Sequence, residues 1–211
     1  MLSLVFPRKC VLCRKLLSRE ETDLCRNCRT HAPEVSHTKF KIPLVAHWQA
    51  LWYYKDDVRR SIHRFKFGNA RSYAQAYARL QAAKLQDLSF DVLSWVPTAP
   101  LRTLKRGYDQ SALLAKALGK ELGVPAIRTL RKVRNTPPQS GLADASHRRA
   151  NILGAYRPVK RQNLAGKRIL LVDDVITTGS TGSECAKTLQ LAGAKEVYLA
   201  AVAAAPHDKN K

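Results

Sequence analysis

The segment that most restricts the fold of this chain runs from Ile169 to Thr181. Its aliphatic start, bounded by Lys167-Arg168 on one side and Asp173-Asp174 on the other, predicts a central parallel strand that is buried on both faces. The two aspartates then lie at the carboxyl end of that strand. Further along, the apolar spacing of residues 182–191 predicts an amphipathic helix.

The loop between this strand and this helix is rich in hydroxyl groups, and consists of Thr177, Thr178, Gly179, Ser180 and Thr181. A loop that leads into a helix N-terminus presents free backbone N–H groups and the positive end of the helix dipole, so it predicts a phosphate site. The neighbouring carboxylates can accept hydrogen bonds from the vicinal hydroxyls of a sugar. Because open parallel sheets bind ligands at their carboxyl edge, the segment predicts a site for a ribose phosphate.

This segment resembles the phosphoribosyl-diphosphate (PRPP) signature of type I phosphoribosyltransferases, in which an aliphatic run precedes two acids and a Thr-Gly-Ser/Thr-Thr loop. An ordinary strand and turn with two solvated aspartates is the plainer alternative. A strand that ends in Asp-Asp also resembles the Walker B element of P-loop ATPases. That interpretation is set aside, because the sequence has no Gly-x-x-x-x-Gly-Lys-Ser/Thr motif.

Four of the five cysteines form two Cys-x-x-Cys knuckles separated by eleven residues: Cys10, Cys13, Cys25 and Cys28. Two knuckles supply the four thiolates of a tetrahedral zinc site, and a site filled by sulfur is structural rather than catalytic. Two redox disulfides are the alternative. We therefore predict a zinc-binding module over residues 1–32, too short to bury a core and stabilised by its metal. The fifth cysteine, Cys185, is predicted to be a packed thiol in the core.

The remaining length suits one medium domain, predicted over residues 42–211 after a linker, because 45% of the 211 residues are hydrophobic. A net charge of +21 predicts binding to polyanions, unless the basic groups only decorate a solvated surface. No apolar stretch is long enough to span a membrane, and the first residues lack the basic region of a secretory signal. We expect a cytoplasmic protein.

Strands and helices alternate along this domain, which predicts an α/β fold with a mainly parallel central sheet flanked by helices. The expected strands are 46–54, 90–97, 126–130, 152–156, 169–172 and 197–205, and the expected helices are 56–66, 70–88, 108–122, 143–151 and 182–191. Residues 32–41 are expected to form the linker, and residues 131–142 a mobile loop. The aromatic residues Trp48, Trp52, Tyr53 and Tyr54 are expected in the core, with stacking on nucleic-acid bases as the alternative.

The strand at 90–97 continues into residues 98–110, predicted to form a loop that carries three basic side chains: Arg102, Lys105 and Arg106. At the carboxyl edge of a sheet, three cations suit a dense anion such as pyrophosphate with magnesium. A turn with solvated basic groups is the alternative.

Several motifs occur in order along nearly the whole chain, and together they resemble the ComF/GntX family. They are the double Cys-x-x-Cys, Lys66-Phe67-Gly68, Lys105-Arg106-Gly107-Tyr108-Asp109-Gln110, the stretch from Arg134 through Arg149 and Asn151, and the PRPP signature. The resemblance implies the type I phosphoribosyltransferase fold and a part in DNA uptake during natural transformation, beside a helicase and other DNA-processing proteins. Tyr108-Asp109 departs from the family pattern, which commonly has Phe-Asn before the Gln, and Asp109 adds a charge near the expected pyrophosphate.

The resemblance also implies roles for the site residues. Asp173 and Asp174 hold the ribose hydroxyls and are the catalytic pair, and residues 177–181 bind the 5-phosphate. The residues around pyrophosphate and Mg²⁺ are Thr98, Ala99, Arg102, Lys105 and Arg106. Lys66 is assigned to the same PRPP site, and Arg131, Arg134 and Gln139 are expected to close over it.

Three functions follow as hypotheses. The chain is an active phosphoribosyltransferase, in which pyrophosphate leaves the anomeric carbon through an oxocarbenium-like state. Alternatively, it is a regulator or adaptor that binds PRPP without transfer. The third hypothesis is a module that binds single-stranded DNA through its basic surface and can coexist with either of the others.

Overall fold

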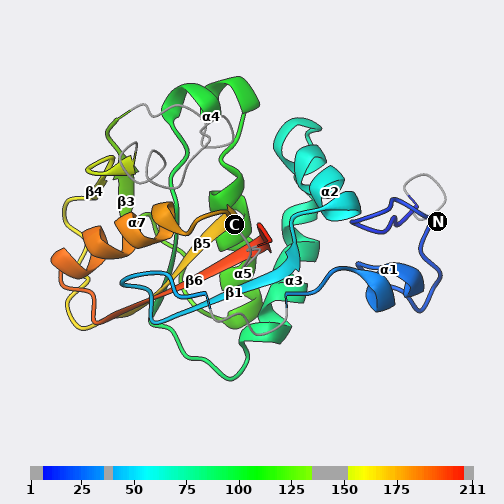
Figure 1. Cartoon of the computed structure of the whole chain (residues 1–211), viewed down its shortest axis with the longest axis horizontal. Helices are drawn as coiled ribbons and strands as arrows, with labels where there is room; N and C mark the ends of the chain where they lie inside the picture. The colour runs from blue at the N-terminus through cyan, green and yellow to red at the C-terminus, as the bar shows by residue number, and fades with distance from the viewer. Residues whose placement is uncertain (1–6, 36–39, 135–151, 207–211) are drawn as a thin grey trace.

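The computed structural model describes residues 7–35, 40–134 and 152–206. Its centre is a parallel sheet of four strands in the order β1-β6-β5-β2 (Figure 1). These strands are β1 (His47–Tyr53), β2 (Val92–Trp95), β5 (Arg168–Ile176) and β6 (Glu196–Ala204). Ile169, Leu170, Leu171 and Val172 of β5 are all buried, because both neighbouring strands and both faces are covered. The predicted α/β fold with a parallel sheet is confirmed.

Helices cover both faces of the sheet. On one face, α3 (Tyr73–Leu85) and α5 (Gln110–Leu122) pack over Leu170 and Val172, together with α2 (Asp56–Phe67). On the other face, α7 (Ser180–Leu191) packs over Ile169 and Leu171. Cys185 of α7 is buried, as predicted for a core thiol. Within the described residues, no helix combines the length and apolarity needed to cross a membrane.

The predicted loop at residues 98–110 is wrong, because the chain there forms the helix α4 (Pro100–Arg106). Pro100 occupies the first turn, where its missing N–H costs nothing, and Gly107 ends the helix in the left-handed conformation with φ of 77°. The predicted helix at 108–122 instead begins at Gln110, because the carboxylate of Asp109 caps it by accepting a hydrogen bond from the backbone N–H of Ala112 at 3.2 Å.

The strand predicted at residues 126–130 is displaced along the chain. Ala126 makes an isolated parallel bridge to Leu93, but Pro125 has no N–H to extend the pairing. The chain forms its strand later, as β3 (Leu130–Lys132), which pairs antiparallel with β4 (Tyr156–Pro158). This two-stranded ribbon lies outside the main sheet, so the strand predicted at 152–156 is displaced as well. The helix predicted at residues 143–151 and the mobile loop beyond residue 134 lie outside the described residues.

The cysteine-rich segment is docked on the main core. It contains α1 (Arg26–His31), and its apolar residues Val11, Leu12 and Leu24 are buried in the same cluster as Ile62 and Phe65 of α2. The sequence predicted a module without a core of its own, and the structure shows that its apolar side chains complete the core of the larger unit. The segment after α1 lies along the edge of β1, where Glu34 pairs with Trp52.

Of the four aromatic residues expected in the core, the structure buries Trp52, whereas Trp48, Tyr53 and Tyr54 are half-buried. Trp52 is buried, and its ring meets that of Tyr77 edge-on with 6.3 Å between centroids. Trp48 donates its indole N–H to the carbonyl oxygen of Phe40 at 2.8 Å.

Candidate functional site

The acid pair lies in the last part of β5, at the carboxyl edge of the sheet. Asp173 Oδ1 accepts hydrogen bonds from Ser111 Oγ at 3.1 Å and from the backbone N–H of Asp174 at 2.8 Å. Asp174 Oδ1 lies 2.7 Å from Lys66 Nζ, and the two side chains are only 15% and 21% exposed. The two carboxylates are therefore held in different directions, one by α5 and the other by the C-terminal turn of α2.

The surroundings of Asp173 also change its acidity. Burial, and then the neighbouring charge of Asp174, raises the pKa of Asp173 to about 7. The ammonium of Lys66 and the hydroxyl of Ser111 act in the opposite direction. Near neutral pH Asp173 therefore gains and loses a proton readily, and a ligand that donates hydrogen bonds to it favours its charged form.

The hydroxyl-rich loop begins α7 with a glycine that no other residue can replace without strain. Gly179 has φ of 72°, and a Cβ at this position would lie 2.7 Å from Cγ1 of Ile42. Thr178 Oγ1 and Ser180 Oγ lie 2.8 Å apart, which braces the turn. The loop thus leads directly into the N-terminus of α7, where the first backbone N–H groups of a helix have no partner within the helix and can bind an anion.

The segment after β2 forms the second side of the site. The guanidinium of Arg106 donates to Gln110 Oε1 at 2.9 Å and lies 4.7 Å from the ring centroid of Phe67. Asp109, the residue that departs from the family pattern, accepts a hydrogen bond from the backbone N–H of Thr98 at 3.1 Å. Burial raises the pKa of Asp109. Its carboxylate therefore has a structural role, since it caps α5 and fixes the start of the segment that leads into α4.

The β3–β4 ribbon supplies a third side that the sequence did not predict. Lys132 Nζ lies 5.5 Å from the ring centroid of Tyr156, and both residues line the same cavity as the aspartates. Burial, and then the charge of Arg102, lowers the pKa of Lys132. Arg131, which was expected to close over the site, is exposed and is not among the residues that line the cavity. We did not predict from the sequence that residues 130–132 form a strand, in which successive side chains point to opposite faces. Lys132 and the adjacent Arg131 therefore lie on different faces.

These three sides enclose a cavity of about 340 Å³, near the lower end of the ~300–1,000 Å³ range of ligand pockets. Nine of the predicted site residues line it: Lys66, Thr98, Ala99, Arg102, Arg106, Asp173, Asp174, Thr177 and Thr181. Ser111, Lys132, Tyr54 and Tyr156 line it as well. Thr178, Gly179 and Ser180 connect the lining residues Thr177 and Thr181 and do not line the cavity themselves. Lys105 belongs to α4. Gln139 lies outside the described residues.

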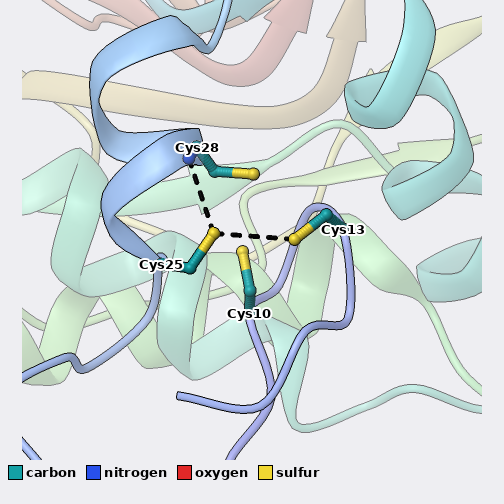
Figure 2. Close-up of side chains that lie close together, drawn as sticks. All are labelled: Cys10, Cys13, Cys25 and Cys28. Carbon is teal, nitrogen blue, oxygen red and sulfur yellow. Dashed lines mark hydrogen bonds between the residues drawn. The ribbon is translucent and has the colours of Figure 1, made fainter. Parts of the chain in front are cut away.

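The four cysteines of the two knuckles form a separate cluster, in which the thiols point towards one another (Figure 2). All four sulfur atoms lie within 4.8 Å of one another, and the Sγ atoms of Cys13 and Cys25 are 3.6 Å apart. A tetrahedral site with Zn–S bonds of ~2.3 Å needs sulfur atoms about 3.8 Å apart, so the geometry suits zinc. The five cysteines are free thiols, and burial raises the pKa of Cys28. A bound cation would offset the cost of ionising such a thiol.

The fold and the site define the class of protein, and the comparison with family models agrees. A phosphoribosyl transferase domain matches residues 109–211, and a double zinc ribbon domain matches residues 1–39. The chain is therefore an α/β phosphoribosyl transferase-type protein with an N-terminal zinc ribbon.

Comparison with curated proteins identifies the family. The chain is 32% identical over 205 residues to DNA utilization protein YhgH of Salmonella typhimurium, covering 90% of this chain and 87% of that protein. It is 29% identical over 220 residues to competence protein F of Haemophilus influenzae, covering 92% and 96% respectively. The chain belongs to this ComF/YhgH competence family. Among solved structures, a glutamine PRPP amidotransferase from B. subtilis aligns with 66% of this chain and 30% of its own, at 21% identity and a TM-score of 0.46.

Proposed function

We propose that the cavity at the carboxyl edge of the sheet binds PRPP with Mg²⁺ and that the protein transfers or holds the phosphoribosyl group. The observation that carries this proposal is the convergence of two carboxylates, a hydroxyl-rich helix start and two arginines on one cavity. Each of these groups suits one part of PRPP: the ribose diol, the 5-phosphate and the pyrophosphate. Neither a solvated turn nor a P-loop accounts for all three together.

The proposed roles follow from the position of each residue. Asp173 and Asp174 accept hydrogen bonds from the ribose hydroxyls, and the loop 177–181 binds the 5-phosphate. The pyrophosphate lies near Thr98, Ala99 and α4, where Arg102 and Arg106 line the cavity and Lys105 belongs to the same helix. A bound Mg²⁺ would neutralise part of the charge of the pyrophosphate.

In a transfer reaction the bond from the anomeric carbon to the pyrophosphate oxygen breaks, and its electron pair leaves with the pyrophosphate. The incoming nucleophile forms the new bond to the same carbon and loses its proton. The arginines stabilise the leaving anion, and the aspartates stabilise the positive charge that develops on the ribose. The protein therefore contributes mainly orientation and electrostatics.

We further propose that this chemistry serves DNA uptake, because relatives carry the names competence protein and DNA utilization protein. A net charge of +21 supports contact with a polyanion such as single-stranded DNA. An adaptor for a helicase that binds PRPP without transfer remains the competing function, and it differs from the enzyme in showing no release of pyrophosphate.

The test is calorimetric titration of PRPP into the protein, with and without Mg²⁺, beside ribose 5-phosphate and pyrophosphate. We expect PRPP to bind more tightly than either fragment and to need Mg²⁺. Equal weak binding of all three anions would show a general basic surface and overturn the proposal. Titration of single-stranded DNA over a range of salt then tests the second proposal, which predicts a steep loss of affinity with salt.

Substitution of Lys132 tests whether the β3–β4 ribbon contributes to PRPP binding. Replacing Lys132 with Gln should weaken PRPP binding by about tenfold or more, because a charge-assisted contact to phosphate contributes roughly 1.5–3 kcal/mol. Arg131→Gln is the matched control, since it removes the same charge from the adjacent exposed residue, and its effect should stay below about threefold. Equal effects of the two substitutions would show that only net charge matters.

The raised pKa of Asp173 predicts a pH dependence of binding. PRPP favours the carboxylate, so its affinity should increase by about tenfold between pH 6 and pH 8 as Asp173 ionises near pH 7. The stability of the fold without ligand changes in the opposite direction as pH rises. A carboxyl group with a raised pKa destabilises the fold as pH rises from about 4 towards 7, because the unfolded chain releases this proton first. Calorimetry measures both the affinity for PRPP and the stability of the fold at each pH. For Asp173→Asn, the affinity should change with pH only as the phosphates of the ligand ionise.

A further inference from the structure

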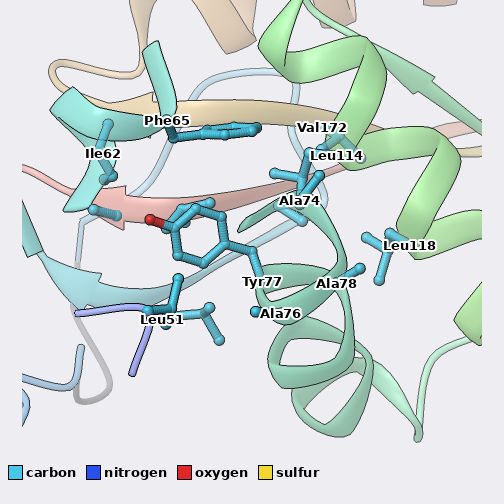
Figure 3. Close-up of a cluster of buried hydrophobic side chains, with 14 of the residues drawn as sticks. Leu51, Ile62, Phe65, Ala74, Ala76, Tyr77, Ala78, Leu114, Leu118 and Val172 are labelled. Carbon is cyan, nitrogen blue, oxygen red and sulfur yellow. The ribbon is translucent and has the colours of Figure 1, made fainter. Parts of the chain in front are cut away.

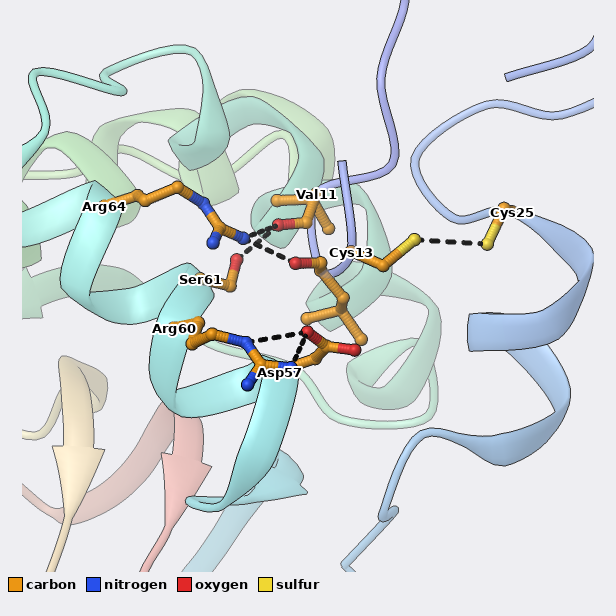
Figure 4. A network of polar contacts seen from close by, with 8 residues as sticks. Val11, Cys13, Cys25, Asp57, Arg60, Ser61 and Arg64 are labelled. Carbon is orange, nitrogen blue, oxygen red and sulfur yellow. Dashed lines mark hydrogen bonds and ion pairs between the residues drawn. The ribbon is translucent and has the colours of Figure 1, made fainter. Parts of the chain in front are cut away.

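The zinc ribbon and the PRPP cavity are connected by one helix, α2. At the ribbon, Arg64 of α2 donates from Nη2 to the carbonyl oxygens of Leu12 at 2.5 Å and Val11 at 3.4 Å (Figure 4). Ser61, one turn earlier, also donates its hydroxyl to the Val11 carbonyl. Both carbonyls belong to the two residues between Cys10 and Cys13. The first knuckle is therefore held through its backbone by side chains of α2.

The Ser61 part of this contact is buried, and the Arg64 part is half-buried, so the knuckle is packed against α2. Ser61 is fully buried, and its hydroxyl lies 2.7 Å from the hydroxyl of Tyr77 in α3. Tyr77 packs edge-on against Phe65 of α2 with 5.5 Å between ring centroids (Figure 3). A second contact joins the ribbon to α3, where Arg79 donates to both carboxylate oxygens of Asp23 at 2.9 and 2.5 Å.

The C-terminal turn of α2, which carries Arg64, also reaches the PRPP cavity through Lys66 and Phe67. Lys66 is two residues from Arg64, a rise of about 3 Å along the helix axis. Its ammonium forms the 2.7 Å ion pair with Asp174, and Phe67 lines the cavity under the guanidinium of Arg106. The backbone carbonyl of Phe65 accepts a hydrogen bond from the hydroxyl of Tyr108, which follows α4. A tilt or rotation of α2 would therefore displace Lys66 from the acid pair.

We propose that the first knuckle of the zinc ribbon is a positioning element of the PRPP site. It acts through Arg64 and Ser61, which set α2 so that Lys66 meets Asp174. This proposal rests on the proposed PRPP function and adds a second role to the zinc cluster, which otherwise only stabilises the fold. Arg64 is a positioning residue, since it contacts the knuckle and lies outside the cavity.

A double-mutant cycle tests the proposal by calorimetry with Mg²⁺ and PRPP. Arg64→Ala should weaken PRPP binding by about tenfold with zinc still bound, whereas Arg64→Ala added to Lys66→Ala should weaken it less than twofold further. Arg60→Ala is the matched control, because Arg60 is on the same helix, pairs only locally with Asp57 at 2.6 Å in the part described, and removes the same charge. It should bind PRPP as the unmodified protein does.

Unmodified protein provides an independent measurement, because coupling between two sites is reciprocal. Saturating PRPP with Mg²⁺ should raise the affinity for zinc severalfold in an equilibrium competition with a zinc-selective chelator, and Lys66→Ala should abolish this gain at saturation. An unchanged affinity for zinc, or an equal effect of Arg64→Ala in both backgrounds, would overturn the positioning role while leaving PRPP binding intact. Absence of PRPP binding by the unmodified protein would overturn the proposed function, and the positioning role with it.

Discussion

Replacing both Asp173 and Asp174 with asparagine should reduce the affinity for PRPP by at least about a hundredfold in the presence of Mg²⁺. Each carboxylate is proposed to accept hydrogen bonds from the ribose hydroxyls, and hydrogen bonds to a charged group contribute roughly 1.5–3 kcal/mol each. The double substitution also removes the partner of Lys66, which now lies 2.7 Å from Asp174. Calorimetric titration of the folded variant gives the result directly.

The variant should fold, which makes the test decisive. Burial already raises the pKa of Asp173 to about 7, so much of the native protein carries this side chain uncharged near neutral pH. Asparagine copies the size of the protonated acid and still offers an oxygen to Ser111. Thermal unfolding should therefore change little or shift upward at pH 8, where the buried charge is most unfavourable.

The matched control removes two charges elsewhere. Asp87 and Asp91 are exposed and lie at the opposite end of the sheet from the cavity, before β2 begins. Asp87→Asn/Asp91→Asn should leave the affinity for PRPP within about twofold. If the Asp173/Asp174 variant bound PRPP as tightly as this control, the acid pair would have no role in binding and the proposed site would be wrong.

The second large effect concerns the zinc cluster. Cys25→Ser should lose zinc and lower the melting temperature by about 10 °C or more, because metal binding in such clusters supplies folding free energy and the apolar residues of the ribbon share the main core. Val11 and Leu12 are buried against α2, so loss of the metal loosens the larger domain as well. Metal analysis and thermal unfolding of purified protein measure both effects.

Cys185 supplies the matched control for the loss of a thiol. It is fully buried on α7, on the other face of the sheet, and is not part of the metal cluster. Cys185→Ser should keep full zinc occupancy and lose stability only through its buried hydroxyl, by ~1–3 kcal/mol. Should Cys25→Ser keep its zinc and melt no lower than Cys185→Ser, the four-cysteine assignment would be wrong.

Much of the fold followed from local patterns. The aliphatic run before Asp173 predicted the central strand, and it lies between two parallel neighbours in the structure. Errors arose where a local signal was overlooked or where pairing was decided at long range. Pro100 and Gly107 are ordinary signals for the start and the end of a helix, and they flank α4. They were overlooked because a loop was expected in this segment. The strand predicted at 126–130 failed because only a single bridge to Leu93 forms there.

Some residues of the candidate site could likewise be predicted from the local sequence, and others could not. Residues close in sequence, such as Asp173, Asp174 and the loop that follows, could be predicted because one strand end and one helix start place them together. Lys132, Tyr156 and Ser111 come from three other elements, and only the packed structure brings them to the same cavity. Their positions depend on the direction of each side chain and on the docking of the ribbon β3–β4.

By itself, the sequence determined the parallel α/β core, the acid pair with its hydroxyl-rich loop, and the four thiols that suit zinc. These depend on hydrophobic period, on strand-end position and on short ligand spacing, all of which act within a few residues. Only the tertiary structure decided that Asp109 caps α5, that Lys66 pairs with Asp174, and that Arg64 joins α2 to the first knuckle. Those contacts join residues far apart in the chain or depend on exact helix ends, and they form only when the core packs.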